Sequence, residues 1–184
     1  MRTPGRAIAG YYPLPPHLVP SIASAVELDP VAEPKHWQLC DPCVGEGAAI
    51  KALREAWVGP AKATHVRIAA CEMEEERAMA AVKALTGRGS VVIHADAFRL
   101  SWPAQCPGAT ILYLNPPYDD DPTHARTERK FLTRFAPALA PGGVLIFVVP
   151  IRALKACAPI LARTFLDIRC WRFPDADFAA YRQV

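Results

Sequence analysis

Short, continuously apolar runs alternate along the chain with segments in which apolar residues recur every three or four positions. Continuous apolar runs are typical of strands buried on both faces, whereas the wider spacing is typical of amphipathic helices. The pattern predicts strands at residues 37–41, 66–72, 91–94, 110–114, 144–149 and 165–173. It predicts helices at residues 17–27, 47–57, 74–85, 126–139 and 151–163, the fourth of them ended by Pro141, Gly142 and Gly143.

The regular alternation of strand and helix predicts an α/β fold, with a doubly wound, mostly parallel sheet and helices on both faces. A chain of 184 residues fits a single domain. Residues 37–184 would form the α/β core, and residues 1–36 an N-terminal segment with one helix. Ligands of such sheets bind at the carboxyl ends of the strands, so the residues that follow each strand are the candidates for function.

Composition narrows the class of protein only modestly. Hydrophobic residues make up 52% of the chain, which is typical of a globular protein rather than a disordered one. No apolar run approaches the ~20 residues that span a bilayer, and the first residues do not form a signal peptide, so we expect a cytoplasmic protein without a membrane partner. The net charge of +3 neither requires nor excludes nucleic acid.

The cysteines do not form a recognisable metal site. Cys40 and Cys43 have the spacing of half a zinc site, but no second pair follows at a suitable distance. We therefore expect no metal. The six cysteines are Cys40, Cys43, Cys71, Cys106, Cys157 and Cys170.

Polar or glycine-rich positions follow the first three predicted strands. Gly45 and Gly47 come soon after Asp41, and glycine permits positive φ and close backbone approach to a ligand, although an ordinary tight turn is the alternative. Glu72 ends the second strand, where a carboxylate can accept both hydroxyls of a ribose or simply begin an acidic helix. Asp96 ends the third, where it can accept an adenine amino group or cap a helix.

The fourth predicted strand ends in the most specific motif, Asn115-Pro116-Pro117-Tyr118. The two prolines fix the backbone and push the preceding residues out of the α region. The carbonyls of Asn115 and Pro116, with the Asn115 side-chain oxygen, would form a rigid set of acceptors suited to a planar amino group. Tyr118 adds an aromatic face on which a base can stack. The alternative is a rigid turn with a buried aromatic residue.

Taken together, these segments resemble the amino-methyltransferase branch of the class I S-adenosylmethionine-dependent methyltransferases, the N6-adenine and N4-cytosine DNA enzymes. The segment from Gly10 to Pro15 resembles the one that closes over the methionine end of the cofactor in those enzymes. The resemblance implies S-adenosylmethionine as cofactor and catalytic roles for Asn115, Pro116, Pro117 and Tyr118. It implies cofactor-binding roles for Tyr11, Tyr12, Pro13, Asp41, Pro42, Cys43, Gly45, Gly47, Glu72, Met73, Asp96, Ala97, Phe98 and Asn115.

The order of the motifs resembles that of the γ-type adenine enzymes, which carry a target-recognition region after the catalytic domain. The resemblance implies DNA as a partner. Because no target-recognition region is recognisable here, we expect recognition from a separate subunit or a further C-terminal domain. The expected function is methyl transfer to an exocyclic amino nitrogen, foremost adenine N6 in DNA, in the setting of restriction-modification.

Several alternatives remain at this stage. An RNA base or a protein glutamine amide presents a similar planar amino group. A non-catalytic subunit of a restriction or phage system would bind the cofactor alone. A nicotinamide-dependent oxidoreductase would leave the Asn-Pro-Pro-Tyr motif unexplained. Arg126, Lys130 and Arg134 share one helical face, which would follow a phosphate backbone or simply face solvent.

Overall fold

The computed structural model describes residues 12–26, 37–87, 89–101, 108–118 and 126–184. Their core is a five-stranded sheet in the order β3-β2-β1-β4-β5, and every neighbouring pair of strands is parallel. The predicted fold class is therefore confirmed. The strands are β1 (Gln38–Asp41), β2 (Arg67–Glu72), β3 (Val91–His94), β4 (Ala109–Leu114) and β5 (Leu139–Phe147).

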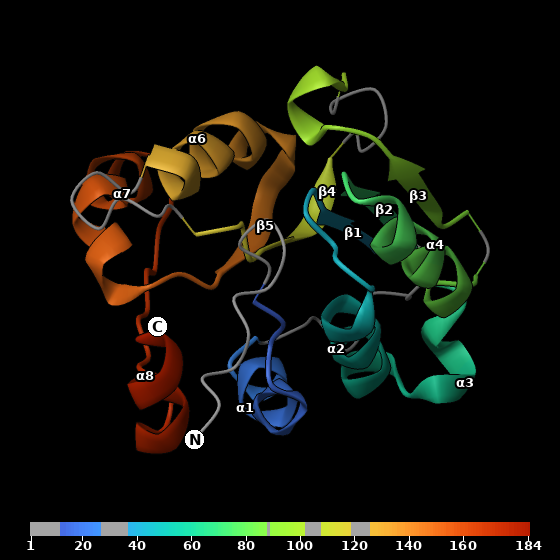
Figure 1. The fold of residues 1–184 in the computed structure, drawn as a ribbon, viewed down its shortest axis with the longest axis horizontal. Helices are drawn as coiled ribbons and strands as arrows, with labels where there is room; N and C mark the ends of the chain where they lie inside the picture. Colours follow the sequence, from blue (N-terminus) through green and yellow to red (C-terminus); the bar gives the residue numbers. More distant parts are fainter. Residues whose placement is uncertain (1–11, 27–36, 88, 102–107, 119–125) are drawn as a thin grey trace.

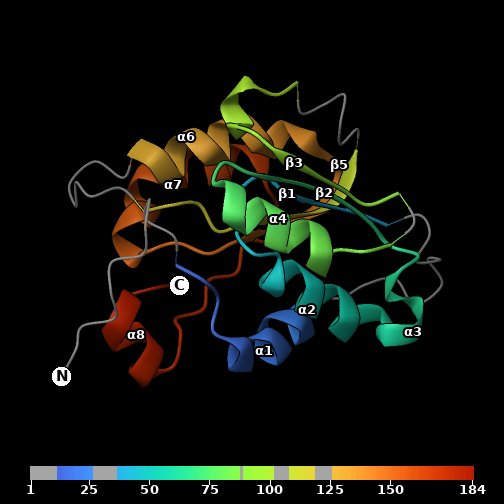
Figure 2. The same cartoon turned by 45° about the vertical axis from the view of Figure 1, so that its right-hand side comes forward.

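Helices cover both faces of the sheet (Figures 1 and 2). One face carries α1 (Val19–Ser24), α2 (Ala48–Val58), the short α3 (Pro60–Ala63) and α4 (Glu75–Ala84), and the other carries α6 (Arg126–Phe135) and α7 (Ile151–Thr164). A last helix, α8 (Asp175–Tyr181), lies beyond the sheet. The 3-10 turns are η2 (Pro16–Leu18), η4 (Ala97–Arg99) and η5 (Ala136–Ala138). No helix within the described ranges is both long and apolar enough to cross a membrane.

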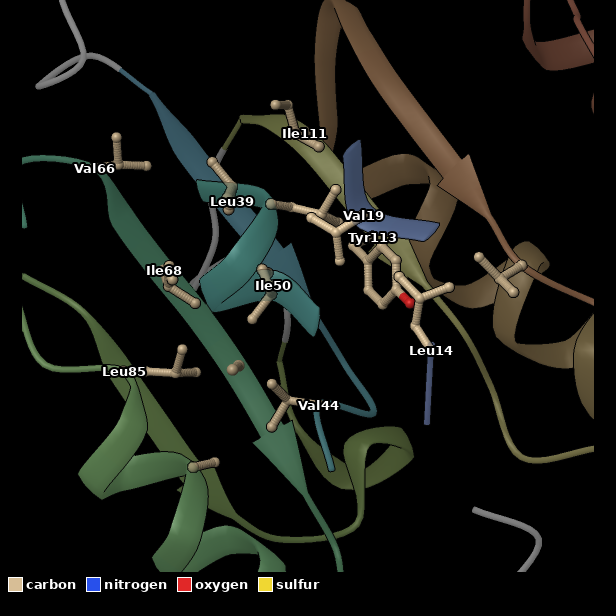
Figure 3. Packing of buried hydrophobic residues seen from close by; sticks show 14 of the residues in the cluster. Leu14, Val19, Leu39, Val44, Ile50, Val66, Ile68, Leu85, Ile111 and Tyr113 are labelled. Carbon is tan, nitrogen blue, oxygen red and sulfur yellow. The ribbon is translucent and has the colours of Figure 1, made fainter. Parts of the chain in front are cut away.

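The strands separate two apolar cores because successive side chains of a strand point to opposite faces. Leu39 of β1 and Ile111 of β4 pack toward α1 and α2, with Val19 and Ile50 against them (Figure 3). The next residue of each strand packs in the second core, against the aromatic side chains of α6. Burial on both faces explains why the strands are apolar without alternation.

The N-terminal segment is anchored in the first core. Leu14 is buried and lies beside Tyr113 of β4 (Figure 3). Val19 of α1 is buried in the same cluster. These contacts hold residues 12–18 along the carboxyl end of β4, which is where the Asn-Pro-Pro-Tyr motif begins.

Two boundaries differ from the prediction near the end of α6. The helix ends at Phe135 rather than at 139, and β5 begins at Leu139. Pro141, Gly142 and Gly143 therefore lie inside β5, where Gly142 has φ 78° and the register with β4 shifts between Ala109 and Ile111. A proline and two glycines read as a helix end in the sequence, but they also permit an irregularity in a strand at the sheet edge.

The predicted sixth strand at 165–173 is wrong. Leu166 is 92% exposed, and Ile168 and Trp171 are each more than half exposed. Among the described residues this segment forms no ladder with the sheet, and a strand without a hydrogen-bonding neighbour is not a strand. Residues 182–184 instead run antiparallel to residues 149–151, through reciprocal bonds between Val149 and Val184.

Candidate active site

The turn between β1 and α2 is built by its own backbone and by Asp41. The Asp41 Oδ1 atom accepts the Cys43 N–H at 3.0 Å, and the Val44 N–H donates to the Cys71 carbonyl at 2.9 Å. Gly45 and Gly47 adopt φ 57° and 82°. A Cβ atom at Gly47 would lie 3.0 Å from the Cγ atom of Leu85 in the loop after α4, so this glycine also serves packing between the turn and its neighbour.

Glu72 lies at the carboxyl end of β2 and links this turn to α4. Its Oε2 atom accepts the Gly45 N–H at 2.9 Å. Its Oε1 atom accepts the Glu74 N–H at 2.9 Å and the Arg77 guanidinium, whose Nε and Nη2 atoms lie at 3.2 and 2.9 Å. Oε1 is thus fully used, whereas Oε2 keeps one lone pair for a further donor.

Asp41 is buried beside this network and is 1% exposed. Burial raises the pKa of its carboxyl from 3.8 to about 7, the hydrogen bond from Cys43 opposes the rise, and the charge of Glu72 adds to it. Burial likewise raises the pKa of the Cys43 thiol, to which the Asn115 backbone hydrogen-bonds. Cys43 therefore joins the glycine turn to the end of β4.

The ends of β3 and β2 lie side by side and present a cap with two exposed apolar side chains, Phe98 after β3 and Met73 after β2. Asp96 Oδ1 accepts the Phe98 N–H at 3.0 Å, so Asp96 caps η4, as one of the two sequence interpretations holds. Phe98 packs on the edge of Phe131 in α6, with ring centroids 4.8 Å apart. Phe98 remains 41% exposed and Met73 61% exposed, so both leave apolar surface open at this edge of the sheet.

The motif after β4 forms a hydrogen-bonded chain with the N-terminal segment. Asn115 Nδ2 donates to the Tyr12 carbonyl at 2.8 Å, and the Tyr118 hydroxyl donates to Asn115 Oδ1 at 3.0 Å. The rings of Tyr12 and Tyr118 stack with centroids 4.8 Å apart and planes 12° from parallel. The bond to Tyr12 identifies which end of the Asn115 amide is nitrogen, so its oxygen faces Tyr118.

Sequence reasoning did not predict a role for Gln183. This residue is fully buried, and its Nε2 atom donates to the Tyr118 hydroxyl. No motif surrounds Gln183 in the sequence. The chain returns to the site through α8 and through the pairing of residues 182–184 with 149–151. Burial also raises the pKa of the Tyr118 hydroxyl.

The predicted residues at the ends of β1, β2 and β4 therefore come together, and those at the end of β3 border them. Pro42, Ala97 and Pro116 are buried, and Pro13 is exposed. Tyr11 lies outside the described residues. Within the described part of the chain, no three His, Cys, Asp or Glu side chains are grouped as metal ligands would be.

The sheet order and the turn after β1 are those of a Rossmann-like α/β fold. A model described as "Uncharacterised methyltransferase family (DUF6094)" matches residues 5–184, and the chain belongs to this family. No curated protein sequence matches it significantly. The family and the fold together identify S-adenosylmethionine as the cofactor.

Solved structures of similar fold support this class. A putative class I S-adenosylmethionine-dependent methyltransferase from Listeria monocytogenes has a TM-score of 0.57 at 15% identity, covering 79% of this chain and 49% of the other. The methyltransferase subunit of a type I restriction-modification system from Streptococcus thermophilus has a TM-score of 0.58 at 20% identity, covering 82% of this chain and 39% of the other. TrmN from Thermus thermophilus has a TM-score of 0.54 at 22% identity, covering 77% of this chain and 40% of the other. The chain thus spans half or less of the length of these proteins.

Proposed function

We propose that this protein transfers a methyl group from S-adenosylmethionine to an exocyclic amino nitrogen of a nucleic-acid base, foremost adenine N6 in DNA. The observation that carries the proposal is the geometry at the end of β4. There, Asn115 is fixed by Tyr12 and Tyr118 beside the glycine turn of β1. An amide oxygen held in one direction is an acceptor for the N–H of a planar amino group.

The residues at the ends of β1, β2 and β3 fit the cofactor. The free lone pair on Glu72 Oε2 would accept one ribose hydroxyl, beside the backbone of Gly45. The exposed apolar surfaces of Met73 and Phe98 would lie against the two sides of the adenine ring, with Asp96 near its amino group. The bound cofactor supplies an electrophilic methyl group on a sulfonium. Asp41 would help to keep the turn closed, since its oxygen holds the Cys43 N–H.

Asn115 would orient the nucleophile. Its Oδ1 atom uses one lone pair for the Tyr118 hydroxyl and keeps the other for an amino hydrogen. The carbonyl of Pro116, which cannot turn because Pro117 fixes it, would take the second hydrogen. Both contacts strengthen as positive charge develops on the amino nitrogen, so they favour the transition state over the bound substrate.

Tyr12 covers the face of Tyr118 that a base would use. The parallel stack of the two rings is the arrangement that an aromatic ring and a base adopt. The Tyr12 backbone carbonyl, not its ring, holds Asn115. The Tyr12 ring would therefore rotate away and yield its place to a flipped base without releasing Asn115.

A basic surface supports nucleic acid over protein as the substrate. The helices α6 and α7 lie side by side on one face of the sheet (Figure 1), and both begin at the edge that carries Asn115. Their one acidic residue, Glu128, is fully buried. Their exposed basic residues are Arg129, Lys130, Arg134, Arg152, Lys155 and Arg163. Such a surface attracts phosphate. Target recognition would come from a further domain or a partner subunit.

The test is methyl transfer by wild-type protein and by Asn115→Ala from labelled S-adenosylmethionine. Duplex DNA, single-stranded DNA, RNA and a protein extract are offered separately. We expect label on an adenine N6 in DNA, a loss of at least about a hundredfold in the variant, and largely retained affinity for S-adenosylhomocysteine. Label on RNA or protein would move the proposal to that substrate class. Equal activity of Asn115→Ala would refute the role of Asn115, and cofactor binding without any transfer would favour a subunit that needs a partner.

A further inference from the structure

The end of the described chain returns to the candidate active site. Residues 182–184 run antiparallel to 149–151, with the Val184 N–H donating to the Val149 carbonyl at 2.9 Å and the Ile151 N–H to the Arg182 carbonyl at 2.8 Å. The Val148 N–H in turn donates to Leu114 at the end of β4. This pairing places Gln183 beside the motif that begins one residue after Leu114.

The Gln183 side chain is poorly explained by packing alone. It is fully buried, and its Oε1 atom has no hydrogen-bond partner among the described residues. A buried amide acceptor without a partner destabilises a fold, so an apolar residue of similar length would suit a purely structural role better. Its Nε2 atom, by contrast, is engaged with the Tyr118 hydroxyl.

The direction of that bond decides where the Tyr118 proton goes. An amide nitrogen only donates, so the Tyr118 oxygen accepts from Gln183. The single hydroxyl proton of Tyr118 is then left for Asn115 Oδ1, which lies 3.0 Å from the hydroxyl oxygen. Gln183 thus sets the hydroxyl rotor of Tyr118 and, through it, the position of Asn115.

We propose that Gln183 is a positioning residue for amino methylation, acting on Asn115 through the Tyr118 hydroxyl. The inference rests on the proposed function. Without the donor, the bond to Asn115 alone holds the Tyr118 hydroxyl, so the hydroxyl moves more and the lone pair that Asn115 offers to the amino group is less sharply directed. Small misplacements of a reacting group reduce rate strongly.

The first experiment is a double-mutant cycle of Gln183→Met and Tyr118→Phe, with Gln38→Met, at the amino end of β1, as the matched control. We expect Gln183→Met to lower kcat about tenfold. The melting temperature, and its rise on binding S-adenosylhomocysteine, should be unchanged or higher. In the Tyr118→Phe background, Gln183→Met should have no further effect on kcat. Wild-type kcat in Gln183→Met, or full additivity with Tyr118→Phe, would overturn the inference.

The second variant, Gln183→Glu, decides the matter even if Gln183→Met does not fold. A protonated glutamate still donates one hydrogen bond, whereas an ionised one only accepts. Activity of Gln183→Glu should therefore fall toward zero relative to wild type as pH rises through the pKa of the buried carboxyl. A constant ratio to wild type would overturn the inference. An active wild type with insensitive Gln183 variants refutes this inference alone, whereas a wild type inactive on every amino substrate refutes the proposed function.

Discussion

Asp41 offers a sharp test of the electrostatics beneath the site. Its carboxyl is buried, and its pKa rises from 3.8 to about 7 in the folded protein. Between these two values the folded state keeps the proton and the unfolded state releases it, so the free energy of unfolding falls as pH rises through this window. At 1.36 kcal/mol per pKa unit, the loss is about 4 kcal/mol and is complete above about pH 7.

Asp41→Asn removes this loss while keeping an oxygen for the Cys43 N–H at the same position. The difference in free energy of unfolding between variant and wild type should therefore grow by a few kcal/mol in favour of asparagine from about pH 4 to about pH 8. Urea unfolding at a series of pH values measures it. Asp167→Asn is the control, since Asp167 is exposed at φ 50°, where asparagine is equally tolerated. A difference that does not change with pH would show that Asp41 titrates alike in both states and would refute the reasoning.

Two further substitutions test the packing and the ion pair around the turn. Gly47→Ala should lower the free energy of unfolding by about 1–3 kcal/mol more than Gly142→Ala. Both glycines have positive φ, but only at Gly47 would the new Cβ meet Leu85. Equal losses in urea unfolding would contradict this. Arg77→Met should cost about 3 kcal/mol because it leaves the Glu72 carboxylate buried without its cation. Adding Glu72→Gln should recover only part of that loss, because glutamine has one oxygen for the two N–H groups, of Gly45 and Glu74, that the carboxylate accepts. A thermal melt unchanged by Arg77→Met would show that the pair contributes nothing.

The Asn-Pro-Pro-Tyr motif shows how far local sequence reasoning reached. The position of the motif after β4 followed from an apolar run that ends at Leu114, and the rigidity of its backbone followed from two prolines. The partners of Asn115 did not follow. The resemblance assigned Tyr12 to the cofactor site, but it did not predict that the Tyr12 carbonyl, 103 residues away, holds Asn115. Gln183 is 65 residues from Tyr118, and no pattern in the chain marks it as a neighbour of the motif.

The failed predictions have the same origin. Residues 165–173 carry the composition of a strand, but a strand of the sheet exists only where a neighbouring strand takes its hydrogen bonds. Within the described residues this segment pairs with no strand of the sheet, and Phe173 at its end donates to the Gln183 carbonyl instead. Pro141, Gly142 and Gly143 are compatible with a helix end and with an irregular edge strand, and their pairing with β4 decided between the two.

The sequence by itself determined the class of fold, because strands buried on both faces must be continuously apolar and the helices between them must be amphipathic. It also determined which residues stand at the carboxyl ends of the strands. Only the tertiary structure decided what those residues do to one another: that Glu72 is held by Arg77, that Asp41 is buried beside it, and that Gln183 fixes Tyr118. Hydrogen bonds and desolvation depend on distances between residues far apart in the chain, and those distances are set by the packing of the whole domain rather than by any local pattern.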